Sequence, residues 1–141
     1  MSQPHQATCV AIGDRALLIE GPPGTGKSSL ALALIDRGAR LVGDDGVLLE
    51  MCEGRLLASP HPNTRGLIEV RNLGILPHPC TAQVPLALVL LLDPAAPRYV
   101  EAAEQVIRAG ATLPLIRLWP DSPVLAIRAE LALAHVGIDP L

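Results

Sequence analysis

Aromatic side chains are almost absent from this 141-residue sequence, which has one Trp, one Tyr and no Phe. Single-stranded nucleic acids bind by stacking bases on aromatic rings in a basic groove, and the net charge here is -3. A nucleic-acid partner is therefore not expected. The longest apolar run, residues 86–92, is far shorter than the ~20 residues of a membrane-spanning helix. The N-terminus lacks the basic and apolar regions of a signal peptide, so we expect a cytoplasmic protein without a membrane partner.

Cysteine and lysine are also scarce. The three cysteines, Cys9, Cys52 and Cys80, are scattered and odd in number. They match neither a disulfide framework nor a zinc-ligand spacing, and free thiols are typical of a reducing compartment. Lys27 is the only lysine among 11 basic residues. A compact ammonium on a flexible stem suits a phosphate-binding loop better than the planar fork of arginine.

The single lysine belongs to a glycine-rich motif. Residues 21–28 read GPPGTGKS and fit G-x-x-x-x-G-K-[ST] without a mismatch. Backbone N–H groups of such a loop bind phosphate oxygens, the lysine reaches the β- and γ-phosphates, and the serine hydroxyl binds Mg²⁺. We therefore expect ATP and Mg²⁺ as cofactors. The expected nucleotide-binding residues are Gly21, Pro22, Pro23, Gly24, Thr25, Gly26, Lys27, Ser28 and Ser29.

The apolar runs and turn residues predict one α/β domain, residues 1–141, built around a mixed sheet. The expected strands cover residues 8–12, 16–20, 39–43, 46–50, 55–58, 86–92 and 113–118. The expected helices cover residues 27–37, 98–109 and 122–136, the first two ending at Gly38 and Gly110. Two proline-rich stretches, residues 59–65 and 77–85, are expected to contain no helix.

Two adjacent aspartates, Asp44 and Asp45, follow the strand expected at residues 39–43. In an open α/β sheet, ligands bind at the carboxyl ends of the strands, so both carboxylates are expected beside the phosphate loop. One would accept the proton of an acceptor hydroxyl and the other would bind Mg²⁺. The structural alternative is an Asp-Asp-Gly turn whose side chains bind nearby backbone N–H groups.

Three blocks in this order resemble the catalytic domain of HPr kinase/phosphorylase. They are GPPGTGKS, LALALIDRGARLVGDDGVLL and GLIEVRNLGI, within residues 8–76, and the short single-domain form of the family is the most similar. The resemblance implies a P-loop kinase core related to phosphoenolpyruvate carboxykinase, and a homo-oligomer, because family members often form hexamers. It implies transfer of phosphate from ATP to a serine of an HPr-like phosphocarrier protein. It also implies a reverse phosphorylase reaction, which uses inorganic phosphate and releases pyrophosphate.

The resemblance further implies a role for each matching residue. Asp44 corresponds to the catalytic base, and Lys27 to the lysine that contacts the phosphates. The expected metal ligands are Ser28, Asp45 and Glu69. Mg²⁺ is usually held by few protein ligands, so a third carboxylate beside it is physically acceptable.

Catalytic roles are also implied for Glu69, Arg71 and His5. Glu69 and Arg71 match the Glu-x-Arg block that the family uses around the metal and in the phosphorylase direction, and a guanidinium suits phosphate. His5 lies one residue before the family's histidine position, where this chain has Gln6. Asn72 replaces a family glycine, and asparagine tolerates positive φ better than most residues. The later stretch WPDSPVL lacks the basic residues of larger members, which favours the kinase direction over the phosphorylase direction.

Two other functions fit the same core. A small-molecule kinase or plain NTPase would use the loop without a protein acceptor, although no Arg-rich lid segment is evident in the sequence. A non-catalytic nucleotide-sensing module would bind the nucleotide without transferring phosphate. The departures at Gln6, at Asn72 and at Ser29, where short family members commonly carry an acidic residue, motivate this second alternative. Transfer of labelled phosphate to an HPr-like protein separates the three functions.

Overall fold

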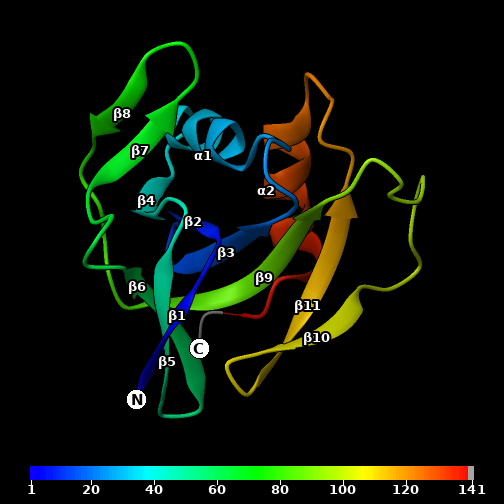
Figure 1. The fold of residues 1–141 in the computed structure, drawn as a ribbon. Helices are drawn as coiled ribbons and strands as arrows, with labels where there is room; N and C mark the ends of the chain where they lie inside the picture. Colours follow the sequence, from blue (N-terminus) through cyan, green and yellow to red (C-terminus); the bar gives the residue numbers. More distant parts are fainter. Residues whose placement is uncertain (140–141) are drawn as a thin grey trace.

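The computed structural model describes residues 1–139 (Figure 1). Its strands are β1 (Ser2–His5), β2 (Thr8–Ile12), β3 (Arg15–Glu20), β4 (Arg40–Gly43), β5 (Val47–Cys52), β6 (Arg55–Pro60), β7 (Leu67–Val70), β8 (Gly74–Pro77), β9 (Val84–Leu92), β10 (Glu104–Arg108) and β11 (Ala111–Leu118). Its helices are α1 (Lys27–Asp36) and α2 (Leu125–Val136). No helix within residues 1–139 is long and apolar enough to cross a membrane.

Nine strands form one curled sheet in the order β1-β5-β6-β9-β3-β2-β4, and β11 joins the sheet at β9 and carries β10. Strand β9 is parallel to both β3 and β11, whereas the other pairs in this sheet are antiparallel. The hairpin of β7 and β8 forms a separate two-stranded sheet. The α/β class and the mixed sheet predicted from the sequence are confirmed.

Two hydrophobic clusters cover the two faces of the sheet. On one face α1 and α2 lie side by side (Figure 1), and their residues Leu30 and Leu133 belong to the same buried cluster as Leu88 of β9. On the other face the curled strands close on one another, with Leu18 and Leu49 in a second buried cluster. Strand β9 is therefore buried on both faces, as its continuous apolar sequence predicts.

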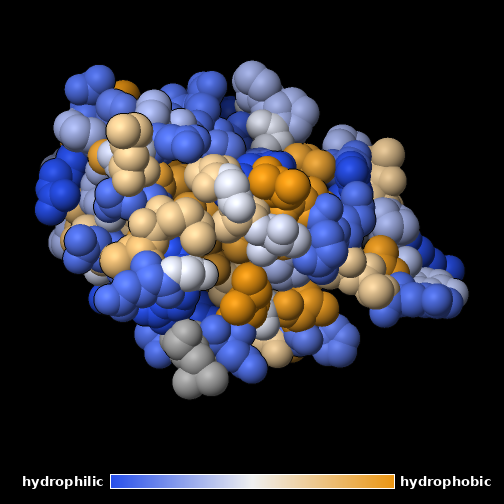
Figure 2. All heavy atoms as spheres, turned by 90° about the horizontal axis from the view of Figure 1, so that it is seen from below, coloured by the Kyte–Doolittle hydropathy of each residue, from blue (hydrophilic) through white to orange (hydrophobic). Residues whose placement is uncertain are grey.

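The carboxyl ends of the parallel strands β3, β9 and β11 lie at one edge of the sheet, which is the upper edge in Figure 1. Strand β4 also ends there, because it is antiparallel to β2, which is antiparallel to β3. The phosphate motif, the two aspartates, and the connections 93–103 and 119–124 all follow these ends. The opposite end, seen in Figure 2, shows hydrophobic groups scattered among charged ones. Ligands of such sheets bind at the carboxyl edge.

The predicted helix over residues 98–109 is wrong. Residues in its second half form β10, which pairs with β11 through a turn where Ala109 and Gly110 have φ of 48° and 84°. Glu104 of β10 also forms an ion pair of 2.7 Å with Arg117 of β11. Helix propensity is a weak preference, and the strand ladder with this cross-strand pair outweighs it.

Strand β1 is a second element in which the structure differs from the sequence prediction, because no strand is expected before residue 8. Its polar sequence SQPH pairs with β5 from Ser2 opposite Glu50 to His5 opposite Val47. The sequence of β1 has no alternation of hydrophobic and polar residues. The strand therefore depends on backbone hydrogen bonds with β5, which is far away in the sequence.

All three cysteines are free thiols, as predicted, and burial raises the pKa of Cys9 far above its usual range.

Candidate active site

The phosphate-binding motif forms a tight loop between β3 and α1. Its glycines Gly21, Gly24 and Gly26 have φ of 155°, 80° and 97°, and glycine adopts such positive values at no steric cost. A Cβ atom at Gly21 would lie 2.9 Å from Thr25 Oγ1 and 3.2 Å from the Leu92 carbonyl oxygen. The start of the loop therefore needs glycine, both for its turn and for its close approach to the end of β9.

The ammonium of Lys27 closes this loop. Its Nζ donates hydrogen bonds to the carbonyl oxygens of Gly21 and Pro22, at 2.9 and 3.1 Å. No carboxylate within residues 1–139 forms an ion pair with it. The first turn of α1 contains no acidic residue, and no side chain caps its N-terminus. The lysine charge and the positive end of the helix are therefore both available to an anion.

A cavity of about 310 Å³ opens over the loop. Its lining residues are Thr8, Pro23, Gly24, Gly26, Lys27, Ser28, Ser29, Asp44, Asp45, Thr64, Leu67, Glu69, Arg71 and Ile75. The loop forms one wall, and the end of β4 with the β7–β8 hairpin forms the other. Most of the predicted site residues thus share one cavity; the remaining loop residues Gly21, Pro22 and Thr25 lie outside its lining.

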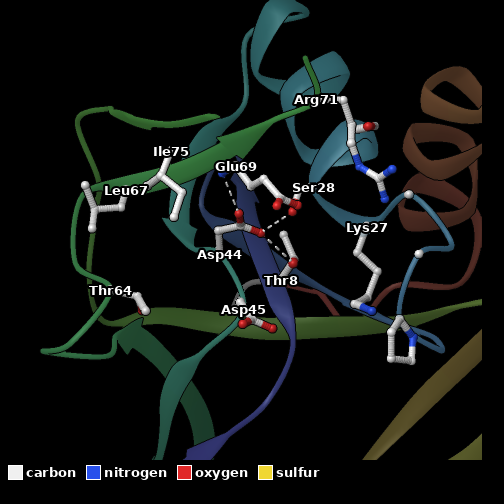
Figure 3. A pocket seen from close by; sticks show the side chains of 14 residues that line it. Thr8, Lys27, Ser28, Asp44, Asp45, Thr64, Leu67, Glu69, Arg71 and Ile75 are labelled. Carbon is white, nitrogen blue, oxygen red and sulfur yellow. Dashed lines mark hydrogen bonds between the residues drawn. The ribbon is translucent and has the colours of Figure 1, made fainter. Parts of the chain in front are cut away.

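Asp44 lies at the centre of this cavity and is only 5% exposed (Figure 3). Its Oδ1 accepts hydrogen bonds from Thr8 Oγ1 at 2.9 Å and from Ser28 Oγ at 2.7 Å. Its Oδ2 accepts one from the backbone N–H of Glu69 at 2.8 Å. These three donors fix the carboxylate, and Oδ2, which has one donor, keeps a lone pair for a further hydrogen. The arrangement is a pre-positioned carboxylate in contact with the phosphate loop.

The residues expected around Mg²⁺ also line the cavity. Asp45 is exposed and has φ of 60°, and Figure 3 shows the carboxylate of Glu69 pointing toward Ser28. In the described part of the chain, no group of three or more His, Cys, Asp or Glu side chains is arranged to hold a metal by itself. Mg²⁺ usually takes one or two carboxylates and completes its shell with water and substrate phosphate. A set of one hydroxyl and nearby carboxylates fits an ion held in that way.

Arg71 adds positive charge from the turn after β7. Its guanidinium forms no ion pair with another side chain among positions 1–139, and Figure 3 shows this group on the same side of the cavity as Lys27. The next residue, Asn72, has φ of 72°. Because asparagine adopts this conformation more easily than most residues, the replacement of the family's glycine leaves the turn intact.

The structure does not bring His5 into the lining of the cavity. Its Nε2 lies 2.8 Å from Glu20 Oε2, and Arg108 donates to both oxygens of the same carboxylate at 2.9 and 2.7 Å. Burial raises the pKa of Glu20, but hydrogen bonds from Arg108 and His5 outweigh it and lower this pKa to about 2. We call these contacts the Glu20 clamp. Because Glu20 directly precedes the loop, the clamp ties β1 and β10 to the residue from which the loop starts.

Because of the Glu20 clamp, we expect the free energy of unfolding to decrease at acidic pH. A carboxyl with a lowered folded-state pKa stabilises the fold above its unfolded pKa, and this contribution is lost as the pH falls from about 4.5 toward 2. Between pH 6 and pH 3 the wild-type protein should lose about 1–2 kcal/mol more unfolding free energy than Glu20→Gln, after allowance for solvent screening. Urea unfolding of both proteins at both pH values measures this difference. Equal losses would show that the clamp contributes no stability.

A family model, the HPr Serine kinase C-terminal domain, matches residues 2–78, which is more than half of the chain. The chain belongs to this family. The HPr kinase/phosphorylase of Clostridium tetani is 51% identical over 63 residues, which are 45% of this chain and 21% of that protein. The HPr kinase/phosphorylase of Clostridium beijerinckii is 45% identical over 67 residues, 48% of this chain and 22% of that protein. The chain matches only about a fifth of the length of these curated relatives.

This member of the HPr Serine kinase C-terminal domain family also matches a solved structure. The Hpr(Ser) kinase/phosphatase from Coxiella burnetii has a TM-score of 0.82 at 27% identity, covering 94% of this chain and 90% of that chain. The structural match therefore extends well beyond residue 78, into the part that the family model does not cover. The predicted resemblance to an HPr kinase fold is confirmed over nearly the whole chain.

Two features of this family member's site are not predicted from the sequence. Thr8 is read only as part of a strand, yet it binds Asp44, because Cys9 lies opposite Gly43 where β2 and β4 pair. Thr64 also lines the cavity, and its buried hydroxyl has no hydrogen-bond partner within residues 1–139. The only feature of the sequence that could have indicated Thr8 is its polar side chain at the start of an apolar strand. No feature of the sequence distinguishes Thr64 from the other residues of its loop.

Proposed function

We propose that this chain is an ATP- and Mg²⁺-dependent protein-serine kinase that phosphorylates an HPr-type phosphocarrier protein. The observation that carries the proposal is the 2.7 Å hydrogen bond from Ser28 of the phosphate loop to Asp44. This hydrogen bond places a fixed carboxylate next to a phosphate-binding loop. A kinase needs both groups close together, because the acceptor hydroxyl must be activated beside the γ-phosphate. The names of the relatives, HPr kinase/phosphorylase, support the choice of acceptor class.

The loop would hold the triphosphate by its backbone N–H groups and the N-terminus of α1. Lys27 would exchange its two carbonyl contacts, at 2.9 and 3.1 Å, for the stronger charge-assisted contacts with phosphate oxygens. The absence of an acidic residue from the first turn of α1 avoids repulsion of the phosphates. Arg71, which lines the same cavity, would add a second positive charge on the side of Lys27 (Figure 3).

In the proposed reaction, Asp44 accepts the proton of the acceptor serine. The seryl oxygen attacks the γ-phosphorus, the bond from that phosphorus to the β–γ bridging oxygen breaks, and ADP leaves with the bonding electrons. Asp44 Oδ2 has the free lone pair for the proton, while Oδ1 stays bonded to Thr8 and Ser28. Lys27 stabilises the charge that develops on the phosphate oxygens.

Ser28, Asp45 and Glu69 would hold Mg²⁺ in this site, because all three line the same cavity as the loop. A bound Mg²⁺ neutralises charge on the β- and γ-phosphates. Asp44 supports this arrangement, since its hydrogen bond fixes the Ser28 hydroxyl and leaves the lone pairs of that oxygen for a ligand.

A protein acceptor is supported by the rim of the cavity. Leu67 and Ile75, on the two strands of the β7–β8 hairpin, line the cavity and are also exposed. Hydrophobic side chains at the entrance suit contact with a protein surface better than contact with a small polar substrate. With ATP and a phosphocarrier as substrates, the proposed enzyme acts in the cytoplasm, and membership of this family supports a homo-oligomer.

The reverse reaction has one specific observation in its favour. Arg71 lines the cavity without an ion-pair partner in the described residues, which suits the binding of inorganic phosphate beside a phosphoserine. In this direction phosphate attacks the seryl phosphorus, the serine leaves with a proton from Asp44, and pyrophosphate forms. The names kinase/phosphorylase and kinase/phosphatase of the relatives agree with it.

Transfer of γ-³²P from ATP to purified HPr-type carriers tests the proposal. We expect Mg²⁺-dependent labelling of one serine, no labelling of an acceptor with that serine replaced by alanine, and none by Lys27→Met enzyme. ATP turnover without any labelled protein would favour the small-molecule kinase or NTPase instead. Nucleotide binding without either reaction would favour the non-catalytic sensing module.

A further inference from the structure

A second cavity, of about 390 Å³, lies at the same carboxyl edge of the sheet. The connection after β9 and the end of β11 form its walls, with Arg128 of α2. Tyr99 and Trp119, the only two aromatic residues of the chain, both line it. Aromatic side chains are thus absent from the rest of the protein and meet in one place, beside the arginines Arg98 and Arg128.

The ring of Trp119 is held in a defined position. Its indole N–H donates to the Ala96 carbonyl oxygen at 2.7 Å, and the Arg128 guanidinium lies 5.7 Å from the ring centroid. Trp119 as a residue remains 40% exposed and lines the cavity together with Arg128, so the contact with Arg128 does not bury it. A ring that is both fixed and accessible is a surface on which a planar group can stack.

The walls around this ring are cross-linked. The backbone N–H of Asp93 donates to the Leu118 carbonyl oxygen at 2.9 Å. The Asp93 carboxylate accepts from the Ala95 backbone N–H at 2.8 Å and from Arg117 Nη1 at 2.9 Å. The end of β9 and the end of β11 are therefore held together, so the cavity between them is a formed site and not a gap beside a loose loop.

The position of this cavity relates it to the phosphate loop. Strands β3, β9 and β11 are parallel neighbours, and neighbouring strands lie about 4.8 Å apart. The loop follows β3, and its residue Gly21 lies directly against Leu92 at the end of β9. The cavity begins one strand further, on the side of the loop away from Asp44, since the order is β4-β2-β3-β9.

We propose that this second cavity receives the base of the nucleotide whose phosphates bind the loop. The inference depends on the proposed function only in requiring a nucleotide on residues 21–28. With Asp44 and the acceptor on one side of the loop, the ribose and base extend to the other side, across the end of β9. The base stacks on the Trp119 indole, since bases stack on aromatic rings irrespective of sequence, and Tyr99 and Arg98 flank it.

Trp119 is the only tryptophan, so its fluorescence reports on this cavity alone. We expect MgATP to change the emission of the wild-type protein, whereas inorganic tripolyphosphate, which has no base, binds the loop and leaves the emission unchanged. Isothermal titration should show ATP binding about tenfold tighter than tripolyphosphate, the gain of one stacked base. Trp119→Leu should remove this gain and keep the tripolyphosphate affinity, and Trp119→Phe should restore most of it.

Two results would overturn the inference. One is tight ATP binding with no change in Trp119 emission, and the other is an equal ATP affinity in wild type and Trp119→Leu. The proposed function fails differently: neither ATP nor tripolyphosphate would bind, or Lys27→Met would not weaken the binding of tripolyphosphate. Because the emission experiment uses the unaltered protein, a folding defect in Trp119→Leu does not affect it.

Discussion

Asp44→Asn is expected to reduce phosphate transfer to the acceptor by about 10²–10⁴-fold, the usual contribution of a positioned general base. The asparagine side chain keeps the size of Asp44 but cannot take up the serine proton. It also replaces one carboxylate oxygen by an NH₂ group, so either the hydroxyls of Thr8 and Ser28 or the Glu69 N–H lose an acceptor. Initial rates of γ-³²P transfer at saturating ATP measure the effect, and ATP affinity is measured in parallel.

Two control variants separate the proton transfer from the positioning. Thr8→Val removes one hydrogen bond to Asp44 and leaves the carboxylate, so its transfer rate should fall by about tenfold or less. Asp45→Asn should weaken the dependence on Mg²⁺ more than the maximal rate. If Asp45→Asn abolished transfer at saturating Mg²⁺ while Asp44→Asn retained it, Asp45 and not Asp44 would be the base.

Gly26→Val is expected to abolish nucleotide binding, with a loss of affinity of at least about 100-fold, equivalent to two charge-assisted hydrogen bonds. Gly26 is the N-cap of α1, has φ of 97° and lines the first cavity. No atom beyond its chain neighbours lies within 4 Å of a Cβ placed there, so the new side chain has room to occupy the space intended for phosphate. Isothermal titration with MgADP measures the loss.

Gly54→Val is the matched control for Gly26→Val. Gly54 has φ of 80° and equally open surroundings, but it lies in the turn between β5 and β6. Both variants therefore force valine into an unfavourable backbone conformation, and only Gly26→Val should lose the nucleotide. Similar losses in the two variants would attribute the effect to general destabilisation, and normal binding by a folded Gly26→Val would remove the loop from the site.

The parts of the fold that the sequence predicts are those whose signal is local. The hairpin over residues 8–20, the loop and the helix from Lys27 each show apolar spacing or turn residues within a few positions. The buried strand at residues 84–92 is marked by its unbroken apolar run. These elements also carry the phosphate motif and precede Asp44, so much of the candidate site could be located before its geometry was known.

The structure differs from the sequence prediction where strand pairing between distant segments of the chain determines the fold. Residues 98–109 contain helix-favouring Glu, Ala and Gln, but the register of Val106 opposite Leu113 and of Arg108 opposite Ala111 makes the second half a strand. The resulting hairpin then brings Arg108 to Glu20, 88 positions away. Local propensity contains no information on a contact of that range.

The site shows the same division. The sequence predicts both aspartates beside the phosphate loop, because ligands of such sheets bind at the carboxyl ends of the strands. The 2.7 Å contact between Ser28 and Asp44 agrees with that expectation, although β2 lies between β3 and β4. It does not predict Thr8 on the same carboxylate or His5 on Glu20, since both depend on strand register. The two cavities likewise need the folded connections, as Tyr99 and Trp119 lie in separate connections of the chain.

The most direct test of the central claim is an amide NMR titration of the ¹⁵N-labelled protein with MgADP. If the loop holds the phosphates, the largest shifts should occur at residues 24–28, with clear changes at Asp44 and Asp45 and almost none at Gly54. Saturable binding that leaves the amides of residues 24–28 unmoved would contradict the claim that this loop and its neighbouring carboxylates form the nucleotide site.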